Sequence, residues 1–124
     1  MKVICTEKAP RAIGPYSQAV EANGFLFVSG QLGIDPVTGA FAPGGIREEA
    51  KQALANANAI VEAAGFHLSR TVKATVFLAD MNDFAVMNEV YATFFGDPFP
   101  ARAAFQVARL PKDAQVEIEL IVAK

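Results

Sequence analysis

Apolar residues recur along the chain with two different periods, and each change of period marks a predicted element. Residues 16–20 and 25–29 are apolar-rich runs on either side of Asn23-Gly24, the preferred pair for a two-residue hairpin turn. Between residues 46 and 64 the apolar positions recur at helical spacing, and Gly65 follows where a C-terminal cap belongs. The first half of the chain therefore predicts a β-hairpin followed by a helix.

The second half of the chain shows the same change of period. Residues 71–78 alternate as a strand does, and residues 84–95 carry an apolar stripe at helical spacing. Two further stretches, 100–107 and 116–120, alternate again. The second helix has three candidate capping residues: Asp80, Asn82 and Asp83. The order β-β-α-β-α-β-β predicts an α+β fold in which one mixed sheet packs both helices on one face.

Charged residues stand inside the last two predicted strands, where a small apolar domain would normally place Val or Ile. Alternation puts Arg102 on one face with Ala104 and Gln106, and it puts Glu117 on one face with Glu119. A charge among small apolar neighbours is expensive to desolvate unless it is paired. These strands therefore predict a partly desolvated site for a small anionic ligand.

Two helices on one face leave the other face of the sheet uncovered. The chain is 52% hydrophobic and only 19% charged, which suggests apolar surface hidden between subunits. The strands carry large or apolar residues across both faces: Phe25, Phe27, Ala104, Phe105 and Ile121. Because an exposed patch of this kind normally marks a partner surface, we expect a homo-oligomer.

Length and charge exclude several classes of protein. The 124 residues predict a single domain spanning 1–124, and the net charge of −2 argues against nucleic-acid binding. No long apolar run or signal-peptide core is present, so we expect no membrane contact and a cytoplasmic protein. Cys5 and His67 are the only residues of their types, which excludes an internal disulfide and the usual zinc sites. We expect Cys5 to be packed and His67 to be a solvated loop residue.

Several separate stretches resemble, in the correct order, the motifs of one known family. They are residues 12–19 (AIGPYSQA), 28–31 (VSGQ), 61–65 (VEAAG), 84–88, 100–102 (PAR), 108–111 (ARLP) and 116–119 (VEIE). With these motifs the chain resembles the reactive intermediate deaminase family (RidA, also called YjgF), essentially from end to end. Two departures are visible: Ala104 stands where many members carry cysteine, and the connection at residues 96–98 is shorter than in some members.

The resemblance implies a fold, an assembly and an activity. It implies a chorismate-mutase-like α+β domain that forms a homotrimer with clefts between the subunits. It also implies hydrolysis of small 2-imino acids such as 2-iminobutanoate and 2-iminopropanoate to 2-oxo acids and ammonia, which clears reactive metabolites. No metal and no organic cofactor are expected.

The resemblance also implies a role for individual residues. Arg102 falls on the carboxylate-binding position and Glu117 on the water-positioning one, while the Tyr16 hydroxyl is placed to donate to substrate or water. Five further residues fall on substrate-binding positions: Ser29, Gly30, Phe84, Asn88 and Ala104. Arg102 and Glu117 are the pair on which hydrolysis would depend.

Each assignment has a structural alternative. Arg102 could instead form an intersubunit ion pair with Glu117 or Glu119, Tyr16 could be a buried aromatic, and Ser29-Gly30 could simply shape a turn. At the level of function, the alternative to an enzyme is a binding module or holdase that captures metabolites or unfolded chains. Ribonuclease activity fits poorly, because the chain is mildly acidic and has a single histidine.

Overall fold

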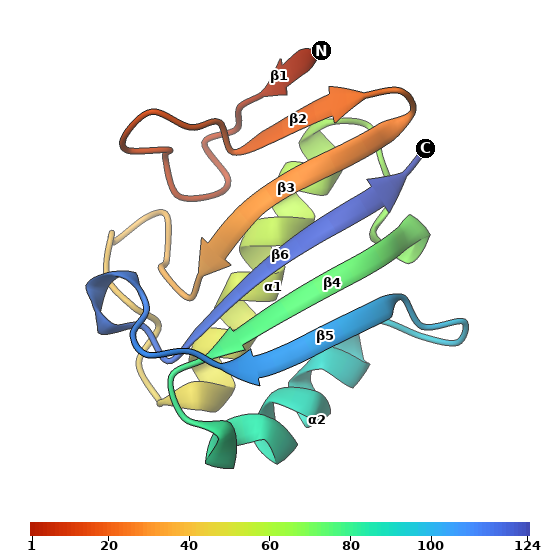
Figure 1. The fold of residues 1–124 in the computed structure, drawn as a ribbon. Helices are drawn as coiled ribbons and strands as arrows, with labels where there is room; N and C mark the ends of the chain where they lie inside the picture. The colour runs from red at the N-terminus through yellow and green to blue at the C-terminus, as the bar shows by residue number, and fades with distance from the viewer.

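The computed structural model describes residues 1–124 as one mixed sheet of six strands backed by two α-helices (Figure 1). The helices are α1 (Ile46–Ala63) and α2 (Phe84–Phe94), and short 3₁₀ turns occur at Leu68–Arg70, Met81–Asp83 and Pro111–Asp113. The strands are β1 (Lys2–Ile4), β2 (Ala19–Ala22), β3 (Phe25–Leu32), β4 (Thr71–Leu78), β5 (Ala101–Gln106) and β6 (Val116–Ala123).

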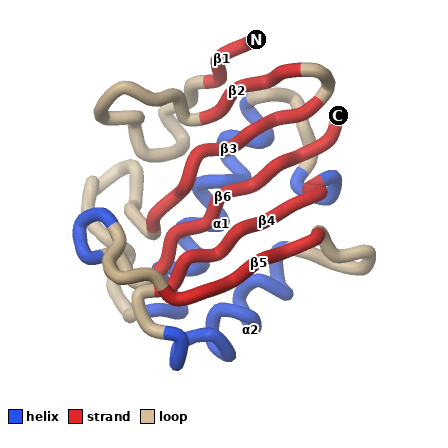
Figure 2. The backbone as a smooth tube through the Cα atoms, viewed as in Figure 1, coloured by secondary structure: helices blue, strands red, loops and turns tan.

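The spatial order of the strands is β1-β2-β3-β6-β4-β5. Only β4 and β5 run parallel, since α2 forms the crossover between them, and every other pair is antiparallel. Both helices lie behind the sheet in the same layer, and no element covers its front (Figure 2). The predicted α+β class and the packing of both helices on one face are confirmed.

Local chemistry explains where several elements turn or stop. Asn23 (φ 52°) and Gly24 (φ 79°) form the tight connection of the β2–β3 hairpin, the conformation that Asn-Gly adopts most readily. Gly65 (φ 78°) follows α1 in the left-handed conformation expected of a helix-ending glycine. Both predictions from these residues are confirmed.

Two predicted strands have other bounds in the structure, and one strand was not predicted. The strand expected at residues 16–20 is Ala19–Ala22, because Gln18 bonds to the preceding loop: its amide donates to the carbonyl of Pro10 and its Oε1 accepts from the N–H of Thr6. The next strand extends past residue 29 to Leu32. The short strand β1 was not predicted, because three residues are too few for a pattern.

The start of the second helix also differs from the expectation. The Asp80 carboxylate accepts from the N–H of Asn82 and so caps the 3₁₀ turn, whereas α2 begins at Phe84 with no side-chain cap bond from Asp83. The chain enters α2 through this turn, which places residues 84, 88 and 91 on the face of the helix that meets β5.

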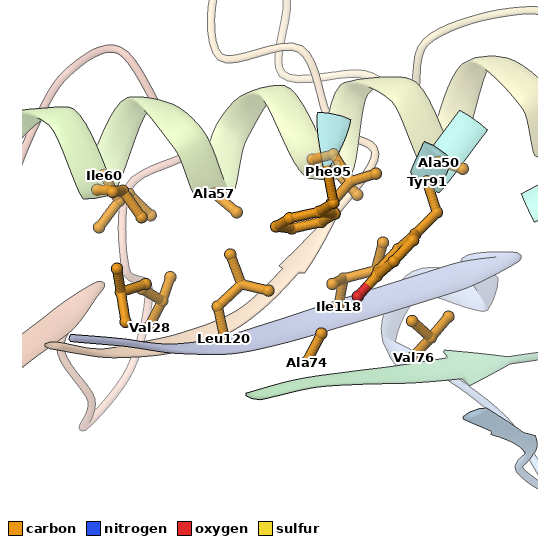
Figure 3. Packing of buried hydrophobic residues seen from close by; sticks show 14 of the residues in the cluster. Val28, Ala50, Ala57, Ile60, Ala74, Val76, Tyr91, Phe95, Ile118 and Leu120 are labelled. Atoms are coloured by element: carbon orange, nitrogen blue, oxygen red, sulfur yellow. The ribbon is translucent and has the colours of Figure 1, made fainter. Parts of the chain in front are cut away.

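The core fills the space between the helices and the sheet. Alanines 50, 53 and 57 of α1 are fully buried and let the helix approach the strands closely, while Ile60 and Leu120 fill the layer between them (Figure 3). Of the two α-helices, none combines the length and the apolar composition that a membrane-spanning helix requires.

The first turns of α1 press directly on the end of β3. A Cβ added to Gly33 would lie 2.6 Å from Cα of Glu49, so only glycine fits at this crossing. The buried Glu49 carboxylate accepts from the backbone and side-chain nitrogens of Gln115 at 3.0 and 2.9 Å. The buried Asn56 side chain donates to the carbonyls of Leu32 and Ile34 at 3.0 and 2.8 Å. These polar contacts fix α1 to β3 and to the residues before β6.

The uncovered face of the sheet carries the expected apolar patch. Phe25, Phe27 and Phe105 are 40%, 44% and 44% exposed, and Ile121 is half-buried beside them. Ala104, in contrast, lies on the helix face and packs against the core. We call the uncovered side, with these phenylalanines and Ile121, the open face.

The two residues that occur only once lie at the surface. His67 is exposed in the turn after α1, as expected. Cys5 is exposed just after β1, so the prediction of a packed cysteine is wrong in the single chain.

Candidate functional site

Arg102 is held on the helix face of the sheet by three side chains of α2. Its Nη1 donates to Oδ1 of Asn88 at 2.7 Å, and its Cζ lies 5.4 Å from the ring centroid of Phe84 and 4.8 Å from that of Tyr91. The residues occur at spacings of four and three along α2, so they share one face of the helix. We call Arg102, Asn88, Phe84 and Tyr91 the arginine cluster.

The guanidinium of Arg102 has no acidic partner within the chain. The three ion pairs of the molecule join Arg47 to Glu89, Arg109 to Asp113 and Lys124 to Glu21. Asn88 takes a single N–H donor, so the remaining donors are available to a planar anion. Arg102 also lines an open depression of about 490 Å³, together with Asn88, Tyr91, Ala92, Phe99 and Pro100.

Tyr91 belongs to this cluster and also to the buried core, as its place on the apolar stripe of the second helix predicts. It is 4% exposed, its hydroxyl has no hydrogen-bond partner, and burial raises its pKa, an effect that the nearby Arg102 opposes. The i, i+4, i+7 spacing of Phe84, Asn88 and Tyr91 was the signal that would have found it. An unpaired buried hydroxyl costs about 1–3 kcal/mol, so stability alone does not favour tyrosine over phenylalanine here.

Ser29 and Gly30 lie in a β-bulge of β3 rather than at the end of a strand. The pairing with β6 shifts register between Val28 and Gln31. A Cβ added to Gly30 would lie 2.8 Å from Cδ of Glu117, so glycine lets the Glu117 carboxylate lie directly against the β3 backbone. Bulges often occur beside active sites, where they redirect a strand.

A hydrogen bond from Ser29 connects β3 to the loop before β2, which carries Tyr16. The Ser29 hydroxyl donates to the carbonyl of Ser17, and this bond holds the loop that carries Tyr16 next to the bulge. Tyr16 itself is 54% exposed, so it is not the buried aromatic of the structural alternative. We call Tyr16, Ser29, Gly30 and Glu117 the glutamate cluster.

The pKa of the Glu117 carboxyl is raised above that of an ordinary glutamate. Partial burial raises the pKa of this carboxyl, and the neighbouring Glu119 on the same face raises it further. Glu117 accepts no protein hydrogen bond that would favour the charged form, whereas Glu119 is exposed. A carboxyl with a raised pKa binds a proton more tightly than an ordinary glutamate, which suits it to accepting a proton from water.

Within one chain the two clusters lie on opposite faces of the sheet. Arg102 aligns with buried Ala74 and points toward α2, whereas Glu117 aligns with Phe77 and belongs to the open face. Strand β4 also separates β5 from β6. The chain thus brings Arg102 together with Phe84 and Asn88, and Glu117 together with Gly30, but it does not bring Arg102 and Glu117 into one cavity.

The side chain of Ala104 packs against the core, so only its backbone N–H is available at the edge of the sheet. Val107 donates its N–H to Leu78 on β4, and bonding alternates along a parallel strand, so the N–H of Ala104 points to the unpaired edge of β5. This donor is therefore free to contact a ligand or another subunit at the edge of the sheet.

Substituting Glu117 by Gln should change how stability depends on pH. The folded chain keeps a proton on Glu117 at pH values where the unfolded chain has released it, so the free energy of unfolding falls as pH rises through the raised pKa. Glu117→Gln should remove that fall, which urea unfolding between about pH 4 and 8 would measure. Glu119→Gln removes a neighbouring negative charge and so lowers the pKa of Glu117, which should move the decrease in the free energy of unfolding to lower pH. Parallel profiles for wild type and Glu117→Gln would contradict the shift.

The fold and the arginine cluster define a small α+β protein with an unpaired arginine beside a surface depression. Residues 6–124 match the model of the family described as Endoribonuclease L-PSP. The chain belongs to this family, which is also called YjgF/RidA.

Similar proteins include both named enzymes and solved structures. The 2-iminobutanoate/2-iminopropanoate deaminase of Bos taurus is 58% identical over 97% of this chain and 88% of its own length. The structure of RidA from the Antarctic bacterium Psychrobacter sp. PAMC 21119 is 48% identical with a TM-score of 0.96 and covers 100% of both chains. The structure of E. coli TdcF with bound serine is 44% identical with a TM-score of 0.94, covering 100% of this chain and 99% of that one.

Proposed function

We propose that this protein hydrolyses small 2-imino acids, such as 2-iminobutanoate and 2-iminopropanoate, to 2-oxo acids and ammonia. The observation that carries the proposal is the free guanidinium of Arg102, oriented by Asn88 and two rings but paired with no carboxylate of its own chain. The names of the mammalian relatives support the same activity, and the serine bound to TdcF supports a site for a small molecule with a carboxylate.

Arg102 would hold the substrate by its carboxylate. A guanidinium forms two parallel hydrogen bonds to a planar carboxylate, which fixes both the position and the rotation of a very small molecule. The backbone N–H of Ala104 lies at the edge of the same strand as a further donor. Orientation of this kind supplies several kcal/mol toward the reaction without any covalent intermediate on the protein.

Glu117 would direct water to the imine carbon. A protonated C=N bond is already electrophilic, so water attacks the carbon, its proton passes to the Glu117 carboxylate, and a carbinolamine forms. Glu117 then returns the proton to the nitrogen and removes the hydroxyl proton of the carbinolamine as the C–N bond breaks, so that the 2-oxo acid forms and ammonia leaves. The proton now on Glu117 passes to the departing ammonia, which regenerates the carboxylate. General acid–base help of this type contributes about 10²–10⁴-fold.

This chemistry requires the two clusters to come from different subunits. We propose a homotrimer in which the arginine cluster of one subunit faces the glutamate cluster of its neighbour across a cleft. The exposed phenylalanines of the open face supply apolar surface for such an assembly. The proposal thus joins two observations: one face of the sheet is uncovered, and the two clusters lie on opposite faces.

A coupled assay tests the activity directly. The purified protein is added to a threonine or serine dehydratase, which releases the 2-imino acid, and the appearance of the 2-oxo acid is followed. We expect the protein to accelerate this appearance in proportion to its concentration. An unchanged rate would reject the deaminase and favour a binding role.

Mixing two inactive variants tests the division of the site. Chains carrying Arg102→Ala and chains carrying Glu117→Gln should each be inactive, but refolded together they should recover about a quarter of the wild-type sites, since random assembly joins two intact clusters in that fraction. A mixture that stays as inactive as its components would show that both residues must come from one chain.

Two other activities receive less support from the residues. Ribonuclease activity, which the family description names, lacks a basic surface here, and the single histidine, His67, is exposed in the turn after α1. A holdase would use the exposed phenylalanines of the open face, which the proposed assembly covers. Suppression of client aggregation that persists in Arg102→Ala would favour the holdase.

A further inference from the structure

Tyr91 is the least explained member of the arginine cluster. It lies three residues after Asn88 on α2, and its ring is stacked against Phe95 with a centroid separation of 4.6 Å and an angle of 37°. Figure 3 shows the side chain reaching from α2 to the sheet with its hydroxyl oxygen toward the strands. The hydroxyl finds no partner there.

The ring of Tyr91 is the nearest aromatic face to the guanidinium. Cζ of Arg102 lies 4.8 Å from its centroid, compared with 5.4 Å for Phe84. A cation over an aromatic face is attracted to it, more strongly where water is excluded. Because Phe95 packs against Tyr91, the ring cannot follow the arginine if the arginine moves.

We infer that Tyr91 is a positioning residue, whose ring holds the Arg102 guanidinium in the orientation that receives the substrate carboxylate. Asn88 fixes one end of the guanidinium by a hydrogen bond, and the Tyr91 ring fixes its plane. Without the ring, Arg102 keeps only the Asn88 hydrogen bond and the more distant Phe84 ring, and it samples orientations in which the two hydrogen bonds to a carboxylate are not both made. This inference rests on the proposed function only for the identity of the carboxylate.

Substitutions at residue 91 separate the ring from the hydroxyl. Tyr91→Phe keeps the ring and should leave KM for 2-iminobutanoate within about twofold of wild type, whereas Tyr91→Met should raise KM about tenfold with little change in kcat. Phe66→Leu is the matched control, because it also removes a buried ring that faces a cation, but that cation is Lys124 and not Arg102. It should leave KM unchanged.

Fluorination gives a second measurement that hardly alters packing. Phenylalanine carrying one and then three ring fluorines at position 91 withdraws electron density from the ring face, so KM should rise stepwise with the number of fluorines. A flat series, or an equal rise of KM in Phe66→Leu, would overturn the inference and leave Tyr91 a packing residue.

Binding of 2-oxobutanoate separates this inference from the proposed reaction. Titration of the Arg102 Nε–H signal by NMR measures carboxylate affinity without turnover. If wild type binds 2-oxobutanoate but hydrolyses no imine, the proposed function fails, and weaker binding in Tyr91→Met still supports the positioning role. If wild type hydrolyses the imine and Tyr91→Met binds 2-oxobutanoate as tightly as wild type, only the positioning role is lost.

Discussion

Arg102→Ala should lower kcat/KM for 2-iminobutanoate by about 10²–10³-fold, because it removes the charge and both hydrogen bonds that hold a desolvated carboxylate. Asn88, Phe84 and Tyr91 would remain in place but none of them carries a positive charge. The coupled assay measures the loss, and the circular dichroism spectrum checks that the fold is intact.

Two further variants make this result specific. Arg102→Lys keeps the charge but not the planar fork, so it should recover no more than about a tenth of the lost efficiency. Arg109→Ala removes an exposed arginine whose partner is Asp113 and should retain full activity. Full turnover by Arg102→Ala would remove the deaminase assignment.

Gly33→Ala should lower the free energy of unfolding by about 3 kcal/mol or more, the largest effect on stability that we expect from a single methyl group. The added Cβ would lie 2.6 Å from Cα and 2.8 Å from C of Glu49, both backbone atoms of α1. Since the backbone of a helix cannot yield as a side chain can, the whole first turn must move. The movement would also disturb the bonds of Glu49 to Gln115 and of Asn56 to Leu32.

Urea unfolding at fixed protein concentration measures this loss, because assembly makes stability depend on concentration. Gly96→Ala is the matched control: nothing lies within 4 Å of its added Cβ and its φ is not positive. Its stability should stay within about 0.5 kcal/mol of wild type. Equal stability of the Gly33 and Gly96 variants would mean that α1 and β3 are less tightly packed than the structure has them.

The sequence predicts the elements well wherever a local pattern is long enough. The helical period over residues 46–64, the cap at Gly65 and the turn at Asn23-Gly24 depend on neighbours in the chain, and all three are confirmed. The displaced strand at residues 16–20 shows the limit. Its boundary is set by the Gln18 side chain bonding to residues 6–10, which hydrophobicity does not encode.

The site is predicted less completely, because alternation along one strand does not say which face meets the helices. Arg102 and Glu117 each stand out as charges within strands, but only the register shows that they lie on opposite faces. The close approach of Gly30 to Glu117 and of Gly33 to Glu49 depends on contacts between distant segments. The sequence marks Gly30 only through its place in the family motif, and it does not mark Gly33 at all.

The position of Arg102 on the last strand of the sheet has an evolutionary consequence. Strand β5 pairs with β4 alone, and the connection before it, residues 96–100, is mostly exposed and contributes Phe99 and Pro100 to the depression. Loops of this kind accept insertions and deletions at small energetic expense. Insertions and deletions in this connection can therefore resize the wall beside Arg102 without changing the buried core, and under the proposed function they would change which imino acids fit.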